Sequence, residues 1–130
     1  MREIKFRAWL KEDKKMVNVE TMDFTDKSIQ YLKRSEIINA YILRRESFDD
    51  VELMQFTGVN DKNGKEIYEG DIVVLNNIEN DNMCIVRYEH SSYRLEGWSL
   101  REDLSNVEDR FLEVVGNIYE NKNLLEENNW

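Results

Sequence analysis

The sequence contains no proline, and its 130 residues include only one cysteine, one histidine and five glycines. A single cysteine, Cys84, excludes an internal disulfide, and one cysteine with one histidine cannot form a structural zinc site. No apolar run approaches the roughly 20 residues that span a bilayer, and the charged, alternating start does not have the apolar stretch of a signal peptide. We therefore expect a cytoplasmic protein with no membrane partner, no metal and no cofactor.

Positive charge is also scarce, because 18 Lys and Arg residues stand against 27 Asp and Glu residues and give a net charge of −9. Duplex DNA binding relies on clustered basic residues, so we expect no direct duplex DNA binding. The basic pairs Lys14-Lys15, Lys33-Arg34 and Arg44-Arg45 each have acidic neighbours, and we interpret them as solvated faces. The composition is nevertheless 41% hydrophobic and 11% aromatic, which is enough for a folded domain of this length.

Alternating apolar residues predict a protein made mainly of short strands. Residues 3–9 alternate strictly and predict a half-buried strand, with Trp9 on the same face as the charged residues. Asn63-Gly64 is the strongest hairpin signal in the chain. Residues 76–82 read as a polar loop, and residues 103–110 contain one or two helical turns. The other expected strands are 16–19, 28–32, 53–57, 71–75, 83–88, 93–100 and 111–119.

Strands at this spacing favour antiparallel sheets over a βαβ fold. We predict a single domain of the α+β class, predominantly antiparallel β. Residues 1–52 would form an N-terminal β hairpin and meander layer, 53–125 an SH3-like small barrel, and 126–130 a frayed tail. Residues 35–45 fit either a short helix capped by Ser35 or a strand ending at Leu43, and we prefer the helix.

The residues that could carry chemistry each have a simpler structural explanation. Asp61-x-Asn63-Gly64 resembles the start of a calcium loop, but its glycine comes too early and a hairpin turn explains it. Glu66, Glu69 and Asp71 are better explained as a turn and the start of a strand than as catalytic carboxylates. His90 has no nucleophile elbow near it and is expected at the surface, and Cys84 is expected in the core. We therefore predict that the protein is not an enzyme.

Three segments give the chain a family resemblance: residues 1–9, residues 53–73 and residues 116–125. Together they resemble the YopX family of small proteins encoded by phages and prophages of Gram-positive bacteria. The chain departs from the family pattern at Leu10 and Lys122, and residues 28–48 match no part of it. The resemblance implies a mostly β fold in the bacterial cytoplasm and implies no activity. The residues of its motifs that we expect to be structural are Gln55, Thr57, Gly58, Asp61, Asn63, Gly64, Tyr68, Gly70, Asp71, Gly116, Asn117 and Tyr119.

The leading hypothesis is a phage or prophage accessory protein that binds a host or phage macromolecule, most simply a protein, with counter-defence as one role. Three alternatives stay open: an acidic DNA mimic, a binder that sequesters a small nucleotide-like ligand, and a self-assembling structural protein, for which a homo-oligomer is expected. Trp9 is a candidate partner anchor, although packing between the two lobes is the preferred explanation of an aromatic residue on that face. Arg7, Arg87 and Arg94 are the expected suppliers of positive charge to a ligand pocket.

Overall fold

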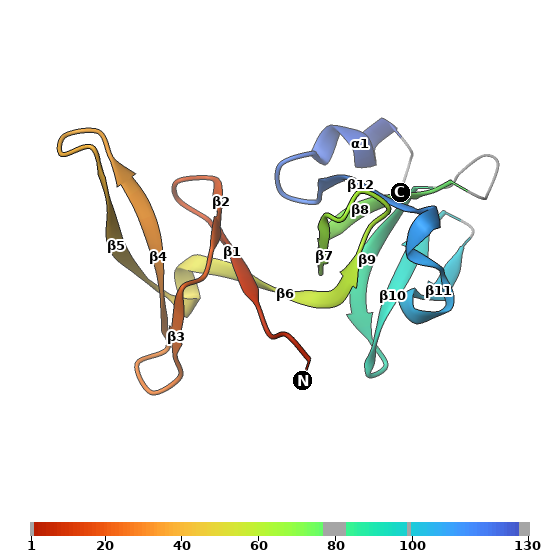
Figure 1. Ribbon diagram of the computed structural model, residues 1–130, viewed down its shortest axis with the longest axis horizontal. Coiled ribbons are helices and arrows are strands. Elements are labelled where there is room, and N and C mark those ends of the chain that lie inside the picture. The colour runs from red at the N-terminus through yellow and green to blue at the C-terminus, as the bar shows by residue number, and fades with distance from the viewer. Residues whose placement is uncertain (1, 77–82, 99, 128–130) are drawn as a thin grey trace. The chain divides into compact units, whose positions relative to one another are not determined.

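The computed structural model describes residues 2–76, 83–98 and 100–127 and shows a mostly antiparallel β protein with one short helix, as predicted (Figure 1). The chain divides into two compact units. The N-terminal unit is Lys5–Gln55, and the C-terminal unit is Phe56–Trp130 together with Met1–Ile4. The division predicted from the sequence, between residues 52 and 53, lies three residues earlier.

The N-terminal unit consists of two hairpins and a joining strand. Strand β1 pairs with β2 on one side and with the start of β6 on the other. Strands β3, β4 and β5 form a separate antiparallel sheet. A small core of Ala8, Leu10, Ile29, Tyr31 and Val51 lies between these strands. The elements are β1 (Phe6–Leu10), β2 (Lys15–Asn18), β3 (Thr21–Asp23), β4 (Ser28–Ser35), β5 (Ala40–Ser47), the 3-10 turn η1 (Phe48–Asp50) and β6 (Val51–Asn60).

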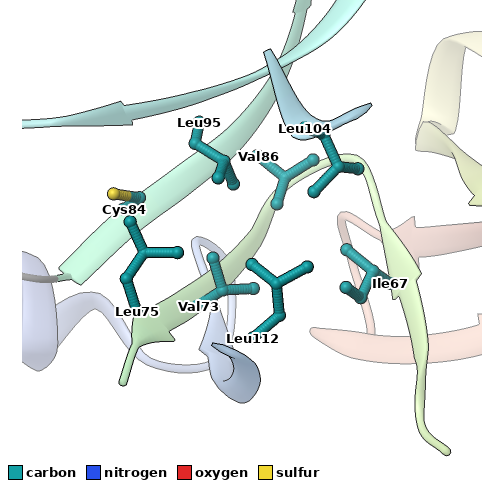
Figure 2. Packing of buried hydrophobic residues seen from close by; sticks show 8 residues of the cluster. All are labelled: Ile67, Val73, Leu75, Cys84, Val86, Leu95, Leu104 and Leu112. Carbon is teal, nitrogen blue, oxygen red and sulfur yellow. The ribbon is translucent and has the colours of Figure 1, made fainter. Parts of the chain in front are cut away.

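The C-terminal unit is a five-stranded sheet in the order β11-β10-β9-β8-β12, which curls around a larger core (Figure 1). The second half of β6 pairs with β7, and Ile67 of β7 joins that core. Figure 2 shows the cluster, to which β8, β9, β10 and β12 each contribute buried side chains. The elements are β7 (Glu66–Tyr68), β8 (Asp71–Leu75), β9 (Met83–Glu89), β10 (Ser92–Gly97), β11 (Arg101–Asp103), η2 (Leu104–Asn106), η3 (Asp109–Phe111), β12 (Leu112–Asn117) and α1 (Lys122–Glu127).

The preferred helix at residues 35–45 is wrong. β4 continues through Ser35, and β5 returns from Ala40, so the two strands make eight cross-strand pairs. The Ser35 hydroxyl accepts hydrogen bonds from the amides of Ile37 and Ile38, as a helix cap would. Asn39 then adopts a φ of 50°, in the left-handed region, and the chain turns back as a hairpin. Pairing with β4 therefore makes this segment part of a β-hairpin, although its local signals favoured a helix.

Three smaller predictions also need correction. The first strand begins at Phe6, and its Arg7 is only 9% exposed, so this strand has no solvated charged face. Residues 126 and 127 belong to α1 rather than to a tail, and 128–130 lie outside the described residues. The predicted polar loop also lies outside them, except for Asn76. The sequence missed the short strands β3 and β11, whereas the helical turns expected at 103–110 are confirmed as η2 and η3.

Nowhere in the described ranges is there a helix with the length and apolarity needed to cross a membrane.

The fold predicts that Cys84 is chemically inert in the native protein. Its side chain is fully buried in the C-terminal core, and burial raises the pKa of the thiol to about 11. At pH 8 only about one thiol in a thousand would be ionised, and the reagent would have no access to it. We expect a chromogenic disulfide reagent to label Cys84 only after unfolding in guanidinium. A Ser105→Cys variant, with its new thiol on an exposed turn, should react at once without denaturant. Equal labelling rates for native and unfolded wild-type protein would contradict the described core.

Candidate binding surface

Asp61 ties the turn after β6 to the last strand of the C-terminal unit. One carboxylate oxygen accepts the amides of Asn63 and Lys65 at 2.8 and 2.9 Å, and the other accepts the amide of Val114 at 2.9 Å. Burial by itself would raise the pKa of Asp61, but these three amides and the Lys65 charge hold it below its ordinary value. Both oxygens of the carboxylate thus accept hydrogen bonds from backbone amides. Of the Asn-Gly pair, only Gly64 has a positive φ.

Asp71 holds a second turn in the same unit. Its carboxylate accepts the amide of Tyr68 at 2.8 Å across the Glu69-Gly70 bend, where Gly70 has a φ of 88°. Tyr68 packs against Phe56, with ring centroids 5.7 Å apart. Thr57 donates its hydroxyl proton to the carbonyl of Ile67 at 2.7 Å, just before the irregular pairing at Gly58. These contacts connect β6, β7 and β8.

A third set of side-chain hydrogen bonds holds the turn at the end of β12. The Asn117 side chain accepts the amides of Tyr119 and Glu120, and the Asn121 side chain accepts the amide of Asn117 at 3.0 Å. A Cβ at Gly116 would lie 2.5 Å from the same Asn121 oxygen, so this close approach requires glycine. The motif residues of the C-terminal unit therefore hold backbone turns. Gln55 lies at the end of the N-terminal unit, opposite Phe6.

The structure does not gather the four predicted binding residues into one site. Arg7 and Trp9 lie on β1 of the N-terminal unit, the first buried and the second half-buried. Arg87 and Arg94 face each other across β9 and β10 of the C-terminal unit. Arg87 lies 3.7 Å from a Glu96 oxygen, and Arg94 donates to Asp103 at 3.0 Å. Each of these two arginines thus has an acidic neighbour within its own sheet.

The residues considered for catalysis, His90, Glu66 and Asp71, lie in a turn or at the start of a strand of the C-terminal unit. His90 is exposed, with a φ of 52° in the turn between β9 and β10. Glu66 accepts a long 3.4 Å contact from the Tyr68 hydroxyl, and Asp71 is bound by backbone. Within residues 2–76, 83–98 and 100–127, no group of three His, Cys, Asp or Glu side chains is arranged to hold a metal ion.

Most of the exposed large apolar side chains that are described in the N-terminal unit lie on the β4–β5 hairpin. Tyr41 and Leu43 of β5 are 63% and 51% exposed, and Ile37 at the tip is 94% exposed. The register places Leu32 opposite Leu43 and Arg34 opposite Tyr41, so these four side chains share one face. We call this the outer face. Such a cluster of large apolar side chains is typical of an interaction surface.

The hairpin differs from the rest of the chain in charge as well. Residues 28–47 contain four basic and two acidic side chains, whereas the whole chain has a net charge of −9. Arg34 lies over the Tyr41 ring at 5.5 Å, and Arg45 pairs with Asp26. The outer face is therefore an apolar surface with cationic edges. A signal for this face is present in the sequence, because Tyr41 and Leu43 alternate with Ile42 and Arg44 as residues of a strand do.

Comparisons with known proteins agree with the resemblance seen in the sequence. A family model described as YopX protein matches residues 5–126. Protein EF1440 from Enterococcus faecalis has a similar crystal structure, with a TM-score of 0.66 and 29% identity over 96% of this chain and 99% of that chain. Protein yopX from Bacillus subtilis has a TM-score of 0.63 and 18% identity over 95% and 98%, a likeness that shows the fold alone. No curated protein matches this chain significantly.

The environment of Asp61 predicts how stability changes with pH. Because the folded pKa of this carboxyl is lowered, its stabilisation is present above its unfolded pKa of about 4 and is lost as the pH falls through the folded pKa. We expect Asp61→Asn to lower the free energy of unfolding by about 1–3 kcal/mol at pH 7, and by clearly less at pH 3. Urea unfolding at both pH values measures this difference. Asp109→Asn, an exposed matched control, should change little, and an Asp61→Asn effect equal at pH 7 and pH 3 would contradict the prediction.

Proposed function

This chain belongs to the YopX family, and we propose that it is a non-catalytic accessory protein that binds a protein partner through the outer face of the β4–β5 hairpin. The single observation that carries this function is the exposure of Leu32, Tyr41 and Leu43 side by side on that face. Large apolar side chains gathered on a protein surface are stabilised when a partner removes them from water. Tyrosine and arginine, which both stand here, are common anchors of protein interfaces.

The chemistry of the partner follows from the charges around the face. Arg34 flanks the apolar residues, whereas the charge of Arg45 is paired with Asp26, so the complementary surface is an apolar pocket with an acidic group opposite Arg34. A second copy of this chain is disfavoured as the occupant, because two molecules that each carry a net charge of −9 repel at long range. The partner is therefore a different protein, from the bacterial host or from a phage.

The remaining parts of the proposal rest on the family resemblance and on the composition. The protein acts in the bacterial cytoplasm as a phage or prophage product, and counter-defence is one role that a binding protein of this kind would serve. The curled sheet of the C-terminal unit supports a small SH3-like barrel as its closest architecture. The DNA-mimic and structural-protein alternatives have no specific observation in their favour.

A pair of matched substitutions tests the proposed face. Leu43→Thr replaces an exposed leucine with a residue that also favours strands, so we expect a change in stability within about 0.5 kcal/mol. Val115→Thr makes a similar change at a 39% exposed position of the C-terminal unit. A partner is first captured from bacterial lysate on wild-type protein and then purified. Its dissociation constant should be at least about tenfold weaker for Leu43→Thr and unchanged for Val115→Thr.

Two outcomes would overturn this function. One is equal partner affinity for wild type and Leu43→Thr. The other is an oligomeric wild type that becomes monomeric in Leu43→Thr when masses are measured by light scattering, because a second copy would then occupy the face. Circular dichroism of both variants establishes that they are folded.

A further inference from the structure

The opposite face of the β4–β5 hairpin lines a groove, and Leu32 and Arg34 of the outer face also reach its rim. Side chains of β4 and β5 form one wall, including Lys33, Ile42 and Arg44, and Lys15 and Val17 of β2 contribute to the other. Because side chains alternate along a strand, Ile42 and Arg44 lie on the face opposite to Tyr41 and Leu43. The groove has a volume of about 610 Å³, within the range of small-molecule sites.

Three cations in this groove have no acidic partner. Lys15, Lys33 and Arg44 form no ion pair with any described residue, although the chain as a whole is rich in carboxylates. The register places Lys33 and Arg44 as diagonal neighbours on one face, a separation of roughly 7–8 Å between such positions. Like charges held this close without a counterion favour the binding of an anion between them.

The groove also has an apolar interior behind these charges. The half-buried side chains of Val17 and Ile42 supply the accessible aliphatic surface, and Leu10 and Tyr31, which are only 4% and 3% exposed, lie beneath it. The acidic side chains in the lining are Asp13 and Glu36, so four basic residues, Arg34 included, face two acidic ones. Burial raises the pKa of the Tyr31 hydroxyl above its ordinary value, as do the nearby charges of Glu46 and Asp13, while Arg44 acts in the opposite sense. Tyr31 is therefore neutral at pH 7 and adds no negative charge to the groove.

We propose that this groove binds a nucleoside diphosphate, with the phosphates between Lys33, Arg44 and Lys15 and the base against the half-buried Val17 and Ile42. Two requirements lead to this class of ligand. Three cations without acidic partners favour a multiply charged anion. The apolar interior favours a ligand in which that anion is attached to a flat, weakly polar group. Inorganic phosphate meets only the first requirement, and a nucleoside meets only the second. An acidic peptide would satisfy the charges, but its flexible side chains offer no flat apolar body to cover Val17 and Ile42.

Calorimetric titration with ADP, GDP, CDP and UDP tests the proposal on the full chain. We expect at least one of them to bind, more weakly at high salt, while adenosine and inorganic phosphate bind far more weakly. Lys33→Gln and Arg44→Gln should each weaken binding about tenfold or more, because each removes a charge-assisted hydrogen bond. Arg101→Gln removes the same charge from an exposed site in the C-terminal unit and should bind as wild type does. Leu43→Thr, on the outer face, should also bind normally.

Backbone amide NMR spectra locate the site independently of affinity. Shifts confined to residues of β2, β4 and β5 support the groove, whereas shifts elsewhere overturn it. The nucleotide assignment also fails if none of the four diphosphates binds at millimolar concentration, if inorganic phosphate binds as tightly as they do, or if a polyglutamate peptide binds in their place. Equal affinity of Arg44→Gln and wild type would likewise overturn it. None of these results depends on the protein partner proposed for the outer face.

Discussion

The N-terminal unit has too small a core to cover its longest hairpin. Strands β4 and β5 each have eight residues, which extend about 26 Å at a normal strand rise. In β4, only Ser28, Ile29 and Tyr31 near its start are buried, and β5 has no buried residue. Cross-strand hydrogen bonds stabilise the far half of the hairpin, but both of its faces remain available. The candidate protein-binding face and the candidate nucleotide groove both follow from this imbalance.

Alternation along the hairpin gives its two faces different chemistry. Arg44 faces the groove, whereas its neighbour Arg45 pairs with Asp26. Lys33 likewise lines the groove, and Arg34, which lies over the Tyr41 ring, reaches only its rim. All four of these basic side chains are exposed, as the sequence predicted, but they differ in their contacts. Arg34 and Arg45 each contact a neighbouring side chain, whereas Lys33 and Arg44 form no ion pair with a described residue, which is the difference that a ligand would use.

Local patterns predicted most strands because their signals lie within a few residues. Residues 71–75 form a buried strand as expected, and Asp61 and Gly64 stand in the turn that their residue types favour. The segment 35–45 was mispredicted because Ser35 makes the same amide contacts in a helix cap and in this turn. The groove could not be predicted at all, since Lys15 and Arg44 come from strands nearly 30 residues apart in sequence whose approach depends on packing across Leu10 and Tyr31.

The family motifs and the candidate surfaces lie in different parts of the chain for a physical reason. Asp61, Asp71 and Asn117 direct their side-chain oxygens at backbone amides, and a group used in this way has little capacity left for a ligand. Their contribution is to hold the turns next to the strands of the C-terminal unit. The β4–β5 hairpin contains none of these turn-holding residues, yet it carries the exposed Leu32, Tyr41 and Leu43 and the cations Lys33 and Arg44. Recognition in this chain is thus best sought on the hairpin, because these exposed side chains do not hold backbone turns.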